Sequence, residues 1–245
     1  MSGHSKFNNI KHTKAKMDAQ RGRIFTKLGK EIAVAVKMGG SDPASNPRLY
    51  NAISKARSNN MPNDNIQRSI KKAAGELGGA SYEELTYEGY GIGGSAVIVN
   101  VLTDNKNRSS GDVRHLFDKF GGSMGASGCV SYLFTRLGVL VIEKADNFSE
   151  DDLFEWSIEA EANDVVDDGD VFEVYTEPNK FEQVKSFLEE KGIKFVSANI
   201  ELVPNSYIDL DEKQYASFMK MIDGLESNDD VQEVFHNVNA QDIDE

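Results

Sequence analysis

The sequence predicts an α+β protein: an N-terminal three-helix bundle followed by two ferredoxin-like α/β sandwich domains, the third domain being inserted in the second. Apolar residues recur with a helical period through the first third of the chain. Beyond it, β-branched runs and amphipathic stretches follow one another in the order β-α-β-β-α-β, which is the ferredoxin-like arrangement. The predicted domains are residues 1–78 (basic arm plus bundle), 79–135 with 205–245 (discontinuous), and 136–204 (inserted).

Charge is distributed very unevenly along the chain. Residues 1–78 contain 15 of the 27 lysines and arginines but only five of the 40 acidic residues. The other residues therefore carry 12 basic and 35 acidic side chains, and the formal net charge of −13 hides two oppositely charged parts. Such asymmetry is typical of a polyanion-binding segment attached to acidic domains. Since charges are screened beyond about 8 Å at physiological salt, the acidic part does not keep phosphates from the basic part.

The first 20 residues are basic and nearly free of apolar side chains. They bury too little surface to order themselves fully, which predicts a mobile arm that settles on a phosphate backbone. A helical apolar period begins at Gly22, with Leu28 and Ile32 on one face. Gly39 and Gly40 are expected to end this helix, because glycine accepts the positive φ of a helix C-terminus.

Two further helices complete the predicted bundle. The second carries Leu49 and Ile53 on its apolar face and ends near Ser58. The third opens around Pro62, because proline has no N–H to leave unsatisfied in a first turn. Its apolar stripe starts at Ile66, and its cations fall on the opposite side. Three short helices with segregated faces predict a small bundle.

Basic side chains on the arm and on all three helices are the candidates for nucleic-acid binding. Charged residues commonly do no more than solubilise helix exteriors, but ordinary surfaces mix both signs. A surface of one sign favours phosphate binding, and about six neutralised phosphates lower affinity roughly a thousandfold between 50 and 200 mM salt. The candidate binding residues are Lys6, Lys11, His12, Lys14, Lys16, Arg21, Arg23, Lys27, Lys30, Lys55, Arg57, Arg68, Lys71 and Lys72, with Phe7 as a candidate stacking residue.

Several short stretches resemble one known family, and the similarity extends over nearly the whole chain. The stretches are Met1-Ser-Gly-His-Ser-Lys6, Asn9-Ile-Lys-His12, Lys14-Ala-Lys16, Arg23-Ile-Phe-Thr-Lys27-Leu, Lys55-Ala-Arg57, Asn60-Met-Pro62, Asp64-Asn-Ile66 and Ile70-Lys-Lys72. They are similar to the YebC/PmpR family. Phe7 stands where that family has tryptophan and Thr13 where it has a basic residue, and a smaller ring weakens stacking on a base.

The resemblance implies a nucleic-acid-binding regulator. Members of this family are generally called probable transcriptional regulators, and some are implicated in translation at the ribosome. The resemblance also implies the nested arrangement of the two α/β domains. Sequence-specific promoter binding is implied by the resemblance alone, because phosphate contacts carry no sequence information.

Glycine clusters at residues 87–94 and 121–128 have the composition of phosphate loops. A phosphate loop must run from a strand into a helix N-terminus. The first cluster leads instead into the β-branched run 96–102, which predicts a strand and therefore a β-hairpin turn before it. The second cluster follows a predicted helix, and a helix-ending connector explains it without a ligand.

The remaining elements follow from periodicity and from β-branched runs. Helices are predicted at residues 106–120, 150–162, 178–191 and 211–226, the second of them capped by Ser149. Strands are predicted at residues 130–134, 139–143, around Val165, 171–176, 195–202, from 206 onward, and 231–238. The strand from residue 206 completes the outer copy of the β-α-β-β-α-β motif, into which the other copy is inserted.

The sequence lacks catalytic and metal-binding signatures. The acidic run from Glu150 to Asp170 lacks the spacing of a calcium loop, which favours a solvated acidic face. The single cysteine, Cys129, excludes an intrachain disulfide and is interpreted as a small buried residue. His115 and His236 are interpreted as surface or core filler, and no zinc-ligand spacing, nucleophile elbow or zinc-protease motif is present. We therefore expect no enzyme activity, no cofactor and no metal.

We expect a cytoplasmic protein without a membrane partner, because the N-terminus has no apolar signal region and no apolar run approaches the roughly 20 residues of a membrane helix. The first functional hypothesis is a transcriptional regulator that binds DNA through its basic N-terminal domain. The alternative is a translation factor that binds ribosomal RNA on the ribosome, and an enzyme acting on nucleic acid or a small molecule ranks third. The acidic domains have the wrong charge for RNA, so a protein partner is expected for them.

Overall fold

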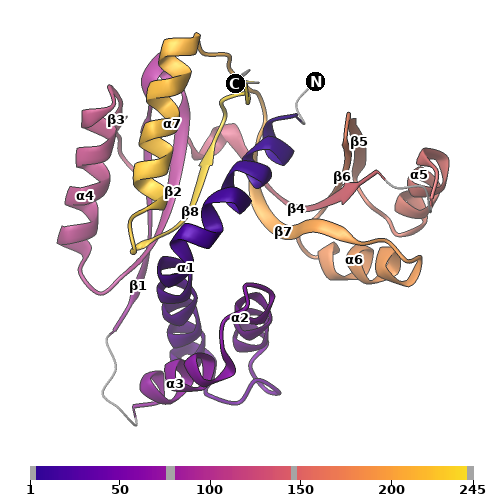
Figure 1. The fold of residues 1–245 in the computed structure, drawn as a ribbon, viewed down its shortest axis with the longest axis horizontal. Helices are drawn as coiled ribbons and strands as arrows, with labels where there is room; N and C mark the ends of the chain where they lie inside the picture. The colour runs from indigo at the N-terminus through magenta and orange to yellow at the C-terminus, as the bar shows by residue number, and fades with distance from the viewer. Residues whose placement is uncertain (1–3, 76–80, 145–147, 242–245) are drawn as a thin grey trace. The chain divides into compact units, whose positions relative to one another are not determined.

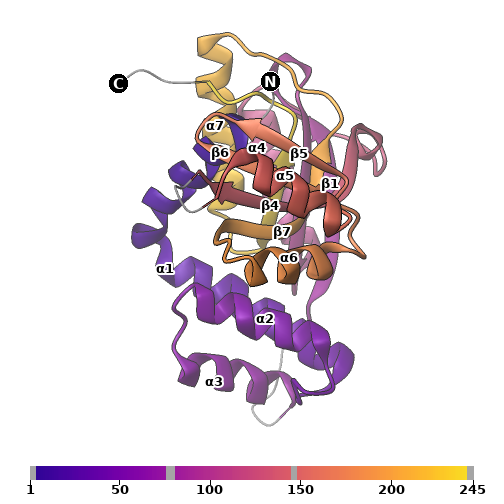
Figure 2. The ribbon, with the colours of Figure 1, turned by 90° about the vertical axis from the view of Figure 1, so that its right-hand side faces the viewer.

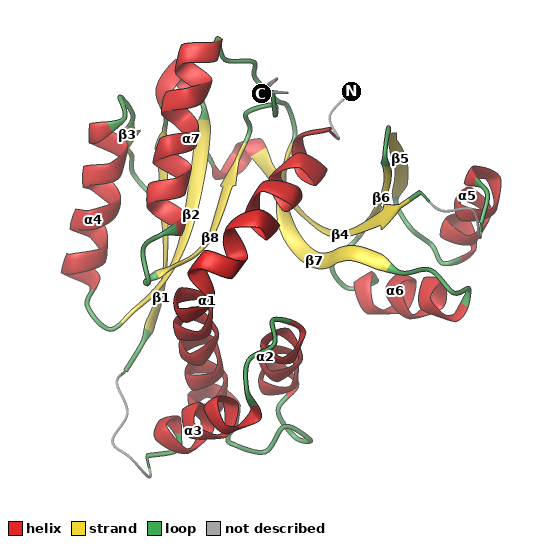
Figure 3. Cartoon of the chain, viewed as in Figure 1, coloured by secondary structure: helices red, strands yellow, loops and turns green. Residues whose placement is uncertain are grey.

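A computed structural model describes residues 4–75, 81–144 and 148–241, with side chains from residue 21 onward. These residues form seven α-helices and two four-stranded sheets, which confirms the predicted mixed α/β class (Figure 3). The chain divides into two compact units. Their bounds are Met1–Thr13, Ser131–Asp211 and Phe235–Glu245 for one, and Lys14–Val130 and Glu212–Val234 for the other. The predicted domain boundaries stay a prediction.

The first helix is much longer than the sequence predicts. Helix α1 runs without interruption over His4–Gly39, so the segment expected to be a mobile arm is its N-terminal half. The expectation underestimated helix propagation. A helix already nucleated in the bundle gains one hydrogen bond for each further residue it fixes, and the segment before Gly22 is free of proline and contains alanine, lysine and glutamine, which favour helix.

Helices α2 (Pro47–Ser58) and α3 (Asn63–Ala73) complete the predicted bundle (Figures 1 and 2). The buried side chain of Asn46 caps α2 by accepting from the backbone N–H of Leu49 at 3.1 Å. Its amide also donates to the carbonyl oxygens of Ala35 and Gly40, each at 2.8 Å, which ties the start of α2 to the end of α1. The bundle core draws buried residues from all three helices and from the connector between α2 and α3: Leu28, Ile32, Ala35, Val36, Leu49, Ala52, Ile53, Ala56, Met61, Ile66 and Ile70.

The first sheet has the strand order β3-β1-β2-β8. Its strands are β1 (Glu83–Tyr90), β2 (Ala96–Thr103), β3 (Ser123–Met124) and β8 (Val231–His236). Helices α4 (Lys106–Lys119) and α7 (Glu212–Glu226) pack against each other, with Leu116 against Gly224 (Figure 1). β1 and β2 pair antiparallel over eight residues each, so the predicted hairpin at the first glycine cluster is confirmed.

The predicted strand from residue 206 is wrong. That segment contributes only an isolated bridge between Ile208 and Val238. Its place in the sheet, between β2 and β3, is taken by β1, which lies before the motif in the sequence. The hairpin turn between Tyr90 and Ala96 closes a short loop, and a short local closure costs less chain entropy than pairing across the inserted domain.

The second sheet has the order β5-β6-β4-β7. It is built from β4 (Phe134–Glu143), α5 (Glu150–Glu159), β5 (Asp164–Asp168), β6 (Val171–Thr176), α6 (Phe181–Glu190) and β7 (Phe195–Pro204), which is the predicted β-α-β-β-α-β sequence of elements. Leu140 and Val174 pack with Leu153 of α5 and Leu188 of α6 in its core. The predicted cap of α5 is confirmed: Ser149 forms a capping box with Asp152.

The two short strands predicted on either side of residue 136 are one strand, β4, preceded by a 3-10 turn at Ser131–Leu133. Gly138 in its middle pairs with both Thr176 and Ile200, so the strand continues through the glycine. A side chain at this position would collide with Thr176 and Phe181. Glycine here serves close packing rather than a turn.

Among the described helices, none is long and apolar enough to span a membrane.

Candidate nucleic-acid interface

Four of the candidate cations lie on the second and third helices, and all four are exposed to solvent. Arg57 is in the last turn of α2, and Arg68, Lys71 and Lys72 are on α3. All four are exposed, and within the described residues none forms an ion pair. The apolar side of α3, with Ile66 and Ile70, is buried in the bundle. These cations therefore remain available to an external anion.

Other candidates on the described part of the bundle differ in availability. Arg21 and Arg23 on α1 are exposed. Lys55 is half exposed and forms an ion pair with Glu31 at 3.3 Å, which weakens its attraction for a phosphate. The side chains of the N-terminal candidates lie outside the described residues, and so does the candidate stacking ring. These are Lys6, Phe7, Lys11, His12, Lys14 and Lys16.

Two of the candidate binding residues, Lys27 and Lys30, form hydrogen bonds with other parts of the protein. Lys27 donates to the carbonyl oxygen of Glu226 at 2.7 Å, at the end of α7. Lys30 donates to the carbonyl oxygen of Asp229 at 2.9 Å and to the carboxylate of Asp230 at 2.5 Å. Burial lowers the pKa of Lys27, against the opposing effect of Glu226 and Asp229. The sequence predicts both lysines as nucleic-acid-binding candidates, and the apolar stripe of α1 does not reveal that this part of its surface meets the end of α7 and the turn before β8.

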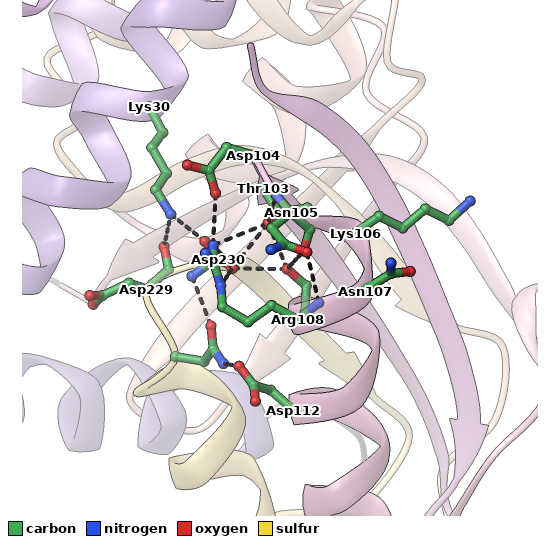
Figure 4. A network of polar contacts seen from close by, with 12 residues as sticks. Lys30, Thr103, Asp104, Asn105, Lys106, Asn107, Arg108, Asp112, Asp229 and Asp230 are labelled. Carbon is green, nitrogen blue, oxygen red and sulfur yellow. Dashed lines mark hydrogen bonds and ion pairs between the residues drawn. The ribbon is translucent and has the colours of Figure 1, made fainter. Parts of the chain in front are cut away.

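The carboxylate of Asp230 is the centre of a buried polar network (Figure 4). One oxygen, Oδ1, accepts from Lys30 Nζ. The other, Oδ2, accepts from Arg108 Nη2 at 2.7 Å, from Ser109 Oγ at 2.8 Å and from Thr103 Oγ1 at 3.1 Å. The network thus joins α1, the end of β2, the start of α4 and the turn before β8.

The titration of Asp230 follows from these partners. Burial by itself would raise the pKa of this carboxyl, but hydrogen bonds from Lys30, Arg108 and Ser109 outweigh burial and lower its pKa to about 2. The same hydrogen bond to Asp230, with a second to Asp104, raises the pKa of Arg108. The buried carboxylate of Asp230 is therefore ionised at neutral pH and is held by the side chains of Lys30 and Arg108.

Four residues of this network are not among the candidates predicted from the sequence: Asp230, Arg108, Ser109 and Thr103. One local signal was available, since Asp104 and Arg108 are spaced to form an ion pair on a helix turn, and they do so at 2.9 Å. Nothing local links Lys30 to Asp230, which is 200 residues away.

The second glycine cluster is occupied by a side chain of the protein. The buried carboxylate of Glu88 accepts from the backbone N–H groups of Gly128 at 2.8 Å and Val130 at 2.9 Å. Backbone N–H groups of this kind are what a phosphate loop offers to its ligand. Because Glu88 already uses them, this connector does not present them to a phosphate.

Nucleophilic and metal-binding chemistry finds no support in the described residues. Burial, and then the charge of Glu88, raise the pKa of the Cys129 thiol, which is half-buried rather than fully buried as expected. Burial lowers the pKa of His236 to about 4, and its Nδ1 accepts from the N–H of Val238 at 3.3 Å. His115 is exposed. Within the described ranges no three His, Cys, Asp or Glu side chains are grouped to hold a metal ion.

The inserted domain carries acidic groups on its sheet as well as on its helices. Asp168 and Glu173 are buried, and the hydroxyl of Tyr175 donates to Glu173. Burial, followed by the charge of Glu173, raises the pKa of Tyr207 to about 12. Because the carboxylates of Asp168 and Glu173 are buried, they do not face a ligand at the surface of the sheet.

Two family models together match almost the whole chain. The model described as the TACO1/YebC protein N-terminal domain matches residues 5–76, and the model described as the TACO1/YebC second and third domain matches residues 82–238. A "Probable transcriptional regulatory protein" from Thermoanaerobacter pseudethanolicus is 52% identical over 242 residues, covering 99% of this chain and 98% of that protein. One of the same description from Acetivibrio thermocellus is 53% identical, covering 97% and 98%.

A solved structure shares the fold. The crystal structure of a conserved hypothetical protein from Aquifex aeolicus superposes with a TM-score of 0.81 at 46% sequence identity. The match covers 94% of this chain and 96% of that one. The fold described above is therefore one already seen in a crystal.

Proposed function

The chain belongs to the TACO1/YebC family, and from this membership we propose that it is a nucleic-acid-binding regulator, in the first place a transcriptional regulator that binds DNA through its basic N-terminal bundle. The observation that carries this proposal is the set of exposed cations on α2 and α3 for which the described residues offer no ion pair: Arg57, Arg68, Lys71 and Lys72. Relatives described as probable transcriptional regulatory proteins support the regulatory role.

The proposed contact is electrostatic. Each exposed cation that meets a phosphate releases counterions, so affinity depends steeply on salt. Arg57 and the cations of α3 take part, together with Arg21, Arg23 and the basic residues of the N-terminal half of α1. Lys27 and Lys30 do not, because their ammonium groups are bound to the segment between α7 and β8. Sequence preference needs base contacts in addition to these.

Ribosomal RNA is the second candidate ligand, and one side chain favours it. Tyr50 on α2 is 63% exposed, the largest aromatic surface on the described bundle. It lies seven residues before Arg57, so the two side chains share a helix face about 10 Å apart along the axis. A ring and a cation on one helix face suit an unpaired base and a nearby phosphate, which RNA loops offer. The bases of duplex DNA are already stacked and are less available to such a ring.

We propose that the chain is not an enzyme and that its acidic domains contact protein. The first point is supported by the glycine connector, because the carboxylate of Glu88 already binds its backbone N–H groups. The acidic ion pairs of the inserted domain, such as Lys144 with Asp167 at 2.6 Å, and the solvated acids around α5 support the second.

The two ligands are separated by crosslinking in living cells and sequencing the DNA and RNA recovered with the protein. Enrichment of promoter DNA supports the transcriptional role, whereas enrichment of ribosomal RNA with co-sedimentation on ribosomes supports the translational one. A variant with Arg57, Arg68, Lys71 and Lys72 changed to glutamine is expected to lose most recovery of either ligand. If that variant recovers both DNA and RNA at the wild-type level, these four cations do not bind either ligand.

A further inference from the structure

We propose that Asp230 is a positioning residue, whose carboxylate holds helix α1 of the cationic bundle at the turn between α7 and β8 through Lys30. This inference rests on the proposed nucleic-acid-binding function only for its consequence, the presentation of the bundle. The contact itself stands on geometry (Figure 4).

The two oxygens of Asp230 have separate partners. Oδ2 is used within the α/β part by Arg108, Ser109 and Thr103, whereas Oδ1 accepts from Lys30 of the bundle. A carboxylate that served only to cap α4 or the turn would not need a cation from α1. Oδ2 therefore binds groups of β2 and α4, and Oδ1 binds helix α1.

Asp230 is held by contacts other than the one with Lys30. The backbone N–H of Asp230 donates to Asn228 Oδ1 at 2.8 Å, and its carbonyl accepts from the N–H of Leu102 at 2.7 Å, in β2. The side chains of Lys30 and Asp230 are only 11% and 5% exposed, so water competes little for either charge. A contact between two groups of which one is already held loses less conformational entropy on forming.

Lys30 makes further contacts at the same place. Its ammonium also binds the carbonyl of Asp229 and lies 5.9 Å from the centre of the Tyr82 ring. Lys27, one helix turn earlier, binds the carbonyl of Glu226. Two successive turns of α1 are thus attached to the segment that joins α7 to β8, which defines an orientation for the helix rather than a single tether point.

The chain offers matched variants for testing this. Lys30→Met removes the link to Oδ1, while Arg108, Ser109 and Thr103 still hold Oδ2 of Asp230. Lys30→Arg keeps a donor for Oδ1. Lys106→Met removes an equal charge at the exposed start of α4, where the side chain extends away from the network (Figure 4).

Electron spin resonance on the full chain reports the orientation directly. Spin labels go on Asn51→Cys in α2 and Arg114→Cys in α4, both exposed, in a Cys129→Ser background. We expect a narrow distance distribution in the parent, Lys30→Arg and Lys106→Met, and one about twice as wide in Lys30→Met, because the bundle then samples more than one orientation. A Lys30→Met distribution as narrow as that of the parent overturns the proposal.

Salt dependence of binding separates positioning from direct contact. With a 30-nucleotide single-stranded RNA as the probe, Lys30→Met should leave the slope of log affinity against log salt unchanged, whereas Arg68→Gln should reduce it by about 1. A slope reduced equally by Lys30→Met would mean that Lys30 contacts phosphate, and would overturn the positioning role. If the parent binds neither this RNA nor a duplex DNA of the same length, the proposed function fails, while the distance measurement still decides the role of Asp230.

Discussion

The ammonium group of Lys30 lies 2.5 Å from the carboxylate of Asp230, although 200 residues separate them in the sequence. The contact joins the basic N-terminal bundle to the turn that precedes the last strand. It also removes a cation from the surface that the charge pattern predicts to bind phosphate. We therefore propose two uses for the cations of the bundle: some hold the bundle in place, and the others bind a ligand.

Removing the charge of Asp230 should destabilise the protein strongly. In Asp230→Asn, Lys30 loses the anion of a buried ion pair and Arg108 loses part of its own, and breaking such a pair costs about 3 kcal/mol. The free energy of unfolding in urea measures this. Asp229→Asn is the matched control, because that neighbouring side chain is exposed and only its carbonyl binds Lys30. Equal stability of the two variants would show that the network contributes nothing.

Acid should weaken the same network within a defined window. The pKa of Asp230 is lowered on folding from 3.8 to about 2, so its contribution is complete above pH 3.8 and is lost as the pH falls through about 2. The shift corresponds to about 2 kcal/mol. In Asp230→Asn, the fall in unfolding free energy across this window should be shallower by that amount, measured by urea titration at each pH. An identical pH profile in the variant would contradict the lowered pKa.

His236 should affect the pH dependence of stability at a higher pH than Asp230 does. Its pKa is lowered from 6.5 to about 4 by burial, so the folded state keeps the imidazole neutral where the unfolded state binds a proton. Stability from this group is complete above pH 6.5 and falls as the pH drops toward 4. NMR titration of the imidazole checks the value, and a midpoint near 6.5 in the folded protein would contradict it.

Single cations on α3 should each contribute to salt-dependent binding. The side chains of Lys71 and Lys72 are exposed. Lys71→Gln and Lys72→Gln are each expected to reduce the slope of log affinity against log salt by about 1, with little effect on stability. Filter binding at several salt concentrations measures the slope. Lys27→Met serves as the comparison, because its ammonium is bound to Glu226 and should leave the slope as it is. A larger effect from Lys27 than from the α3 lysines would place the ligand elsewhere.

Tyr50 should distinguish unpaired from paired bases. Tyr50→Ala is expected to lower affinity for single-stranded RNA by about 1–3 kcal/mol, through loss of stacking, and to leave affinity for duplex DNA unchanged. Tyr50→Phe keeps the ring and should bind like the parent. Fluorescence anisotropy with both ligands provides the comparison. If Tyr50→Ala affects duplex and single strand alike, the ring does not stack on a base.

The inserted domain was predictable because its elements are defined by local patterns. The β-branched run of β6, the capping serine before α5 and the apolar period of α6 each give the correct element without knowledge of the rest. The long helix α1 was predicted only in part, since the sequence shows where its buried face starts but not how far a solvated helix continues beyond it.

The first sheet and the internal contacts of the bundle were not predictable in the same way. β1 enters the sheet at a place that the motif order assigns to a later segment, and only the pairing of β1 with β2 settles it. Lys27 and Lys30 look like their exposed neighbours in sequence. What distinguishes them is the position of Glu226 and Asp230 in three dimensions, which no spacing within α1 encodes.

The central claim is that the exposed cations of α2 and α3 bind nucleic acid, and a mobility-shift titration of two charge-matched full-length variants tests it most directly. One variant changes Arg57, Arg68, Lys71 and Lys72 to glutamine. The other changes Lys144, Lys180, Lys185 and Lys191, which lie in the inserted domain and form ion pairs there. We expect the first to lose about 100-fold or more in affinity at 50 mM salt and the second to bind like the parent. Equal affinity of both variants would contradict the claim.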